Sequence, residues 1–117
     1  MLEPSKMPLR FYRNASGAEP LRDWLKALDR ADRLELGQHI ERVQYRWPVG
    51  MPLCRAMGDG LWEVRARLPN ATIARVFFCF QSGALILLHG FIKKTQKTPH
   101  DELKIARRRK KEIEDGK

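Results

Sequence analysis

Three apolar segments with turn residues between them constrain the fold of this chain most. Residues 61–68, 72–80 and 85–92 are rich in Val, Ile, Leu and Phe, and Pro69-Asn70 and Ser82-Gly83 separate them. Segments of this length and composition, joined by short turns, favour strands that pair with their sequence neighbours. We therefore expect a three-stranded antiparallel meander in the second half of the chain.

The second turn sets the register of the last two strands. If Ser82-Gly83 is a two-residue turn, Arg75 lies opposite Gly90 and shares a face with Ile92 and Lys94. Gly90 has no side chain, so this register leaves open space beside Arg75.

The first turn is predicted to contain three residues, because proline cannot adopt the positive φ that a two-residue type I′ loop demands. A loop over residues 69–71 places Arg65 opposite Arg75, with Glu63 on the same face. A slip of one residue would instead move Arg65 to the other face.

Helical periodicity dominates the first half of the chain. After a short expected strand at residues 9–12, apolar residues recur at helical spacing over residues 21–28 and 36–47. We expect a capping box at residues 16–19 to start the first helix and Asp32 with Glu35 to cap the second. The two helices then form a hairpin.

A loop and a last helix complete the predicted organisation. Residues 48–60 contain two prolines and three glycines and carry no sustained period, which is typical of a loop. The last helix begins near Pro99, with Asp101 and Glu102 in its first turn, where acidic residues suit the helix dipole. The predicted order is β-α-α-β-β-β-α in one α+β domain over residues 1–117.

Composition narrows the partner and the compartment. The 117 residues include 23 Lys and Arg against 14 Asp and Glu, a net charge of +9 that favours a polyanionic partner such as nucleic acid. Cys54 and Cys79 lack the spacing of a zinc site or a disulfide framework. No apolar run is long enough to cross a membrane, and the N-terminus has no signal-peptide core. We expect a cytoplasmic protein without membrane association, metal or cofactor.

The distribution of charge is more informative than its sum. Residues 64–100 contain no Asp or Glu, yet they include six cationic residues: Arg65, Arg67, Arg75, Lys93, Lys94 and Lys97. Cations without local carboxylate partners are free to bind an external anion, such as a row of phosphates. A second basic group, residues 107–111, wraps more than one helical turn, so we expect it to steer RNA without taking part in chemistry.

Three motifs carry a family resemblance. They are GLWEVR at residues 60–65, ARVFF at residues 74–78 and LHGFIKKTQKTP at residues 88–99. Together they resemble the RelE/HigB superfamily of toxins, in particular its phage-related HigB-like branch. The resemblance implies a RelE-like fold: a twisted antiparallel sheet with a helical hairpin packed on it, followed by a C-terminal helix.

The activity implied by this resemblance is that of a type II toxin–antitoxin system: metal-independent cleavage of mRNA, usually on the ribosome. Attack of the ribose 2′-hydroxyl on the adjacent phosphate requires a base, cations on the phosphate and an acid for the leaving 5′ oxygen. By position in the motifs, Arg65 and Arg75 would stabilise the phosphate charge. Lys93 or Lys94 would do the same or protonate the leaving group, since surrounding cations lower the pKa of a lysine.

The general base is an open question in the sequence. Many members of the superfamily place a tyrosine or a histidine near the C-terminus, whereas both tyrosines here precede the predicted sheet. The candidates are Glu63, His89 and His100, and the alternative is that no strong base exists. Further RNA contacts are expected from six residues: Arg67, Lys97, His100, Arg107, Arg108 and Lys111.

The resemblance also implies partners: a small helix-turn-helix antitoxin, mRNA and the ribosome, with operator DNA bound only through the antitoxin complex. Two alternatives stay open, a non-catalytic nucleic-acid-binding module and an inactive toxin-fold protein that only binds its antitoxin and operator DNA. For an active toxin, we expect Arg75→Ala to abolish growth inhibition while leaving the fold intact.

Overall fold

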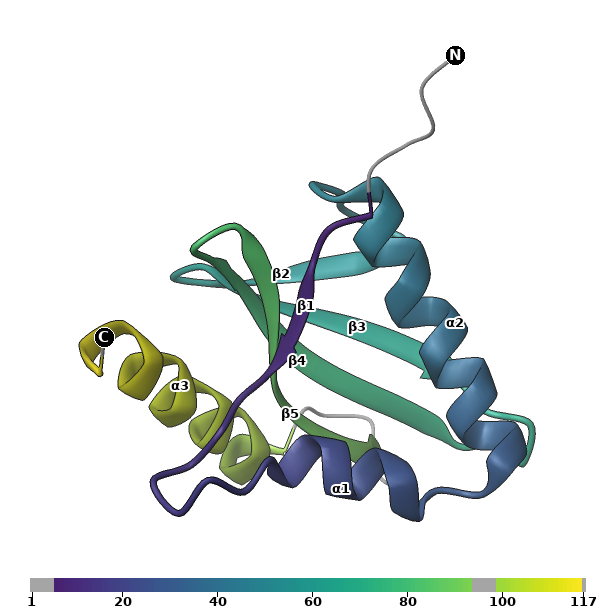
Figure 1. The fold of residues 1–117 in the computed structure, drawn as a ribbon. Helices are drawn as coiled ribbons and strands as arrows, with labels where there is room; N and C mark the ends of the chain where they lie inside the picture. The colour runs from purple at the N-terminus through teal and green to yellow at the C-terminus, as the bar shows by residue number, and fades with distance from the viewer. Residues whose placement is uncertain (1–5, 94–98, 117) are drawn as a thin grey trace.

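The computed structural model describes residues 6–93 and 99–116 (Figure 1). Its elements are β1 (Leu9–Phe11), α1 (Pro20–Ala27), α2 (Arg30–Arg46), β2 (Cys54–Gly58), β3 (Leu61–Arg67), β4 (Ile73–Gln81), β5 (Ala84–Lys93) and α3 (His100–Asp115). The strands form one sheet in the order β1-β5-β4-β3-β2, in which β1 runs parallel to β5 and the other neighbours are antiparallel. The predicted α+β class, the helical hairpin and the meander of β3, β4 and β5 are confirmed.

The strand β2 corrects the predicted order, which becomes β-α-α-β-β-β-β-α in the described chain. We expected residues 48–60 to form a loop, but Cys54 pairs with Val64 and begins an antiparallel strand beside β3. A register shift between Ala56 and Gly58 interrupts this pairing. Most of β2 is exposed at the edge of the sheet, so its sequence lacks the hydrophobic alternation that would predict a strand.

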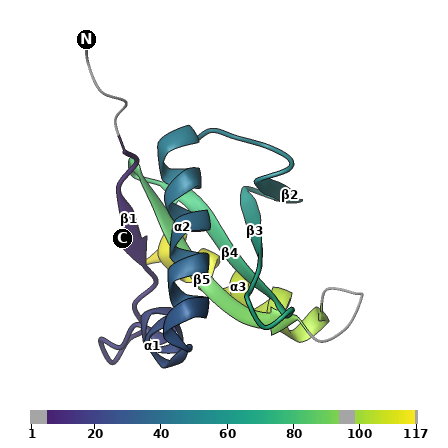
Figure 2. The ribbon, with the colours of Figure 1, turned by 90° about the vertical axis from the view of Figure 1, so that its right-hand side faces the viewer.

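The sheet lies between two helical layers (Figures 1 and 2). On one face, α1 packs on β5 and α2 packs on β3, and Leu36 and Ile40 join a core that includes Val76. On the other face α3 packs on β4 and β5, where the fully buried Ala106 meets the second core cluster around Phe77. In Figure 2, α2 lies in front of the sheet and α3 behind it.

The helix starts differ from the predicted caps. Ser16 belongs to a turn in which its hydroxyl donates to Asn14 Oδ1, and α1 begins later, at Pro20, whose fixed φ suits a first helical position. The second helix begins at Arg30, so Asp32 lies inside its first turn and is buried. The start of α3 next to Pro99 is confirmed. None of the helices in residues 6–93 and 99–116 is long and apolar enough to cross a membrane.

Candidate nucleic-acid interface

The register of β3 and β4 agrees with the sequence analysis. The Leu68 amide donates to the Thr72 carbonyl at 2.8 Å, which closes a three-residue loop. Arg65 therefore lies opposite Arg75, as predicted. Glu63 lies two residues from Arg65 on the same strand and hence on the same face.

The register of β4 and β5 differs from the prediction beyond a β-bulge. The two-residue turn is confirmed, and Phe78 lies opposite Leu87, but Phe77 then lies opposite His89. The extra residue in β5 shifts all later pairs by one. Arg75 consequently faces Phe91 across the strands, and the predicted alignment of Arg75 with Gly90 is wrong.

Gly90 serves the other face of the sheet. A Cβ atom there would lie 2.8 Å from a side-chain carbon of Leu21 and 2.8 Å from one of Trp24, both on α1. The missing side chain thus allows α1 to pack closely against β5 and creates no space beside Arg75. By the same register, Ile92 lies on the hairpin face, whereas Lys93 shares the face of Arg75.

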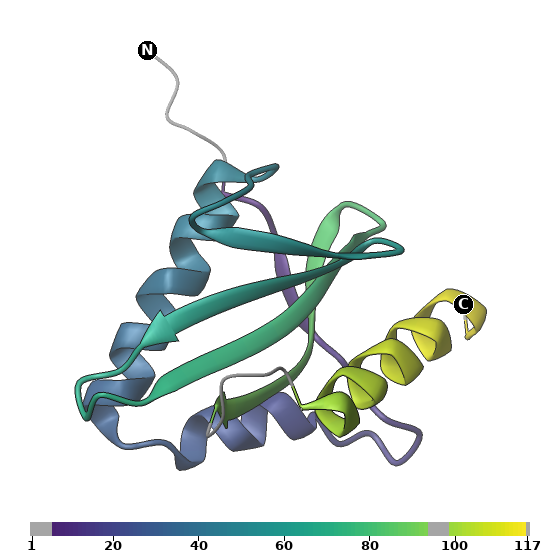
Figure 3. The same ribbon diagram turned by 180° about the vertical axis from the view of Figure 1, so that it is seen from behind.

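Cationic side chains gather on the face that carries α3. Cross-strand pairing puts Lys93 in line with Ile73 and Arg67. Seen from behind in Figure 3, α3 covers only one side of this face, and no described helix lies over β2 and β3 there. We call the four exposed or half-buried cations of this face the sheet cations: Arg55, Arg65, Arg67 and Lys93.

Beside the sheet cations lies a buried ion pair. Arg75 Nη2 pairs with Glu63 Oε2, and the two side chains are 2% and 0% exposed. The Phe91 ring centroid lies 6.0 Å from the Arg75 guanidinium carbon. Neither charged group of the pair reaches solvent in this structure.

The burial of the pair corrects our expectation that Arg75→Ala would leave the fold intact. Removing one partner of a buried ion pair leaves the other charge without compensation in a low-dielectric interior, which costs several kcal/mol. Two guanidinium atoms of Arg75, Nε and Nη1, also have no hydrogen-bond partner within the described ranges. We therefore expect the stability of the fold to depend on Arg75.

Lys93 lies at the end of β5 and is half-buried. Partial burial is the largest cause of a lowered pKa of its ammonium group. The carboxylate of Glu63 opposes this shift, and three arginines lower the pKa further: Arg75, Arg65 and Arg55. The expected influence of neighbouring cations on this lysine is thus present. Lys94 and Lys97 lie outside the described residues.

His89 is joined to α3. Its Nε2 lies 2.5 Å from Glu102 Oε1, its Nδ1 lies 3.4 Å from Arg109 Nη1, and its ring stacks on Phe91. His100, by contrast, is exposed at the first position of α3. The structure therefore separates these two base candidates, one held between elements and one open to solvent.

The basic group of α3 docks the helix onto the sheet. Arg107 Nη2 donates to the Met57 carbonyl of β2 at 2.8 Å, and Arg109 Nη1 donates to the Leu88 carbonyl of β5 at 2.9 Å. These guanidinium groups satisfy backbone acceptors, so they are much less available for RNA than their charge suggests. The remaining exposed members of the block are Arg108 and Lys111.

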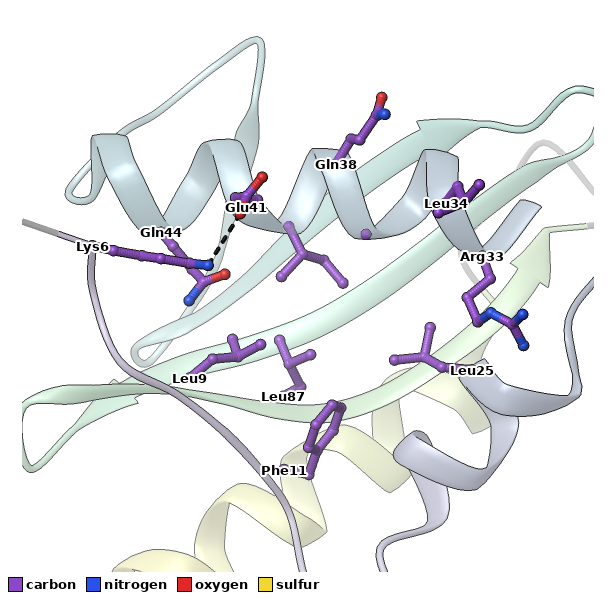
Figure 4. Close-up of a pocket in the computed structure, with 12 residues that line it drawn as sticks. Lys6, Leu9, Phe11, Leu25, Arg33, Leu34, Gln38, Glu41, Gln44 and Leu87 are labelled. Carbon is purple, nitrogen blue, oxygen red and sulfur yellow. Dashed lines mark hydrogen bonds and ion pairs between the residues drawn. The ribbon is translucent and has the colours of Figure 1, made fainter. Parts of the chain in front are cut away.

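A hollow on the opposite side of the molecule is separate from this interface (Figure 4). It has a volume of about 410 Å³ between β1 and α2, with Leu9, Ile40 and Leu87 in its wall. Lys6 Nζ donates to Glu41 Oε2 at 3.0 Å beside it. None of the described residues predicted for the site lines this hollow.

Thiols and carboxylates provide no metal centre in the described ranges, where no three His, Cys, Asp or Glu side chains come together as a ligand set. Cys54 and Cys79 are free and buried, and burial raises the pKa of each thiol to about 11. At neutral pH both are thiols without nucleophilic character.

Comparison with known proteins relates this chain to a family. A search of curated proteins finds no match to the sequence. A family model described as phage-derived protein Gp49-like (DUF891) matches residues 23–111, which run from α1 into α3 and include strands β2 to β5. Because the match covers most of the chain, this protein belongs to the phage-derived Gp49-like (DUF891) family.

Proposed function

We propose that this chain is the toxin of a type II toxin–antitoxin system and cleaves mRNA on the ribosome without a metal. The observation that carries the proposal is the set of sheet cations on one face. The carboxylate among them, Glu63, is fully buried and already paired with Arg75. A surface whose cations lack local compensation favours a phosphate backbone.

Family membership supports the same proposal. The Gp49-like family is generally considered RelE/HigB-like, in agreement with the three sequence motifs. The partners that follow are the helix-turn-helix antitoxin, mRNA and the ribosome, and operator DNA through the antitoxin complex, all in the cytoplasm.

The proposed cleavage reaction uses the exposed side chains of the interface directly. The 2′ oxygen attacks the phosphorus, the bond from phosphorus to the 5′ oxygen breaks, and a 2′,3′-cyclic phosphate and a 5′-hydroxyl result. Arg65 stabilises the negative charge that develops on the phosphate, and Lys93 donates the proton to the 5′ oxygen. The lowered pKa of Lys93 makes it a better acid at neutral pH. Lys94 is the second candidate for this step.

Arg75 and Glu63 contribute indirectly, from their buried position below the exposed cations. Because both are buried, their contribution is to hold β3 and β4 together and to supply a fixed field below Arg65. Of the base candidates, His100 is the one whose side chain is exposed, so it is the preferred candidate for the general base that removes the 2′ proton.

The test is primer extension on cellular mRNA after brief induction of the wild type and of an Arg65→Ala/Lys93→Ala variant. Neither substitution opens the core, and circular dichroism checks that the variant folds. We expect discrete cleavage sites with the wild type and none with the variant.

Two other outcomes would contradict the proposal. Salt-dependent RNA binding without any cleavage product would indicate a non-catalytic nucleic-acid-binding module. Absence of both cleavage and growth inhibition, together with tight binding of a neighbouring helix-turn-helix protein, would indicate an inactive toxin-fold protein.

A further inference from the structure

We propose that Arg55, on the edge strand β2, binds a backbone phosphate of single-stranded RNA beside the phosphate held by Arg65. The inference rests on the proposed function in taking RNA as the ligand. It assigns a phosphate contact to the edge strand β2 and extends the bound RNA beyond the cleaved bond.

The placement of Arg55 follows from the strand pairing. Arg55 lies directly opposite Glu63, and Glu63 lies two residues before Arg65 on β3. Opposite residues of an antiparallel pair share a face, and so do alternate residues of one strand. The side chains of Arg55 and Arg65 therefore project from the same face as Lys93.

The charge of Arg55 is not neutralised by its neighbours. Glu63, the carboxylate across from it, has no exposed surface and pairs with Arg75 instead. Asp59, the acid in the turn that follows β2, lies 3.8 Å from Arg107. Among the described residues, the Arg55 guanidinium itself has no ion pair, and the side chain is exposed.

The span of the sheet cations leaves room for more than one phosphate. Neighbouring strands lie roughly 4.8 Å apart, so the three steps from β5 to β2 cover about 14 Å. Because this separation between the strand backbones is much wider than one phosphate group, cations at its two ends are placed to contact different phosphates. In Figure 3 no described helix lies over the part of this face formed by β2 and β3, and this is where an extended RNA chain would cross. Arg55 is also near enough for its charge to influence Lys93.

Binding of a 2′-O-methyl RNA oligonucleotide tests the inference, because this probe has the phosphate backbone and no nucleophilic 2′-hydroxyl. Fluorescence anisotropy over a series of salt concentrations gives the slope of log K against log salt. For Arg55→Ala, we expect the slope to become shallower by about 0.7, the loss of one single-strand phosphate contact. Arg55→Lys retains a cation and should keep most of the slope.

The matched control is Arg42→Ala, which removes another exposed arginine from α2 on the opposite side of the sheet. We expect this variant to bind with the wild-type slope. If Arg55 had a purely structural role, Arg55→Ala would lower the urea midpoint of unfolding but keep the wild-type slope of log K against log salt. That result would overturn the inference. So would an equal loss of salt slope in Arg55→Ala and Arg42→Ala, or failure of the wild type to bind the probe.

The experiments distinguish failure of the Arg55 phosphate site from failure of the proposed nuclease function. If the wild type binds the probe with an Arg55-dependent slope but cleaves no mRNA, the phosphate site stands and the nuclease proposal fails. If the wild type cleaves mRNA and Arg55→Ala keeps the wild-type slope, the nuclease proposal stands and this inference fails.

Discussion

Two groups of cations lie near the interface, the sheet cations and the basic block of α3 at residues 107–111, and their side chains differ in what they contact. The sheet cations project from β2, β3 and β5 and form no ion pairs within the part of the chain that the structure describes. The block at residues 107–111 is denser in sequence, yet Arg107 and Arg109 donate to backbone carbonyls of the sheet. Lys110 lies 2.5 Å from Glu114 in the next turn of α3.

The comparison shows that local charge density does not measure availability for a ligand. Helical spacing brings acids at i+4 beside the bases of α3, whereas residues 64–93 contain no acid at all. Arg65, Arg67 and Lys93, which stand apart in sequence, therefore have no ion pair among the described residues and remain available to a phosphate backbone.

The largest effect is expected from the buried pair that underlies the sheet cations. Arg75→Ala should lower the free energy of unfolding by about 3 to 5 kcal/mol, because it leaves Glu63 charged and unpaired in the core. Urea unfolding followed by circular dichroism measures this loss.

A double variant provides the control for this prediction. Arg75→Met combined with Glu63→Leu removes both charges while keeping apolar volume, so it should recover most of the stability that Arg75→Ala loses. A free energy of unfolding of Arg75→Ala within about 0.5 kcal/mol of the wild-type value is what substitution at an exposed site would give. That result would mean that the buried pair does not support the sheet cations as we describe.

The next effect concerns the protonation of Lys93. An acid must be protonated to donate, so the cleavage rate should fall as pH rises through the pKa of Lys93, which lies below the ordinary value of 10.5. Lys93→Arg keeps the charge but stays protonated throughout, so it should cleave about 100-fold more slowly. Rates of mRNA cleavage measured from neutral to alkaline pH provide the check. An unchanged alkaline limb in Lys93→Arg would remove Lys93 from proton transfer.

The smallest effect distinguishes members of the α3 block from one another. Arg107→Ala should lower the free energy of unfolding by about 1 kcal/mol, because it removes the hydrogen bond from α3 to the carbonyl of Met57. Lys111→Ala, at an exposed position on the same helix, should change it by less than about 0.5 kcal/mol. Equal losses in thermal or urea unfolding would mean that Arg107 does not dock the helix.

Much of the fold was predictable because local chemistry determines it. Pro69 disfavours a two-residue type I′ loop, and the three-residue loop expected in its place puts Arg65 opposite Arg75, as the structure shows. The bulge in β5 was not predictable, because it depends on the packing of both Leu88 and His89 against α3.

The parts of the site that could not be predicted depend on tertiary contacts. Arg55 lies in a segment whose prolines and glycines indicate a loop, and only pairing with β3 turns it into a strand. The burial of Arg75 and Glu63 likewise depends on packing from several elements. One signal was present: Glu63 is the last acid before a stretch of 37 residues that contains none.

The most direct test of the central claim compares equal losses of charge in the two regions. The rate of mRNA cleavage in a translation extract is measured for the wild type, for Arg65→Ala/Lys93→Ala and for Arg108→Ala/Lys111→Ala. We predict that the sheet variant cleaves at least about 100-fold more slowly, whereas the helix variant stays within a few-fold of the wild type. A comparable loss in both variants, or a larger loss in the helix variant, would contradict the assignment of the RNA site to the sheet.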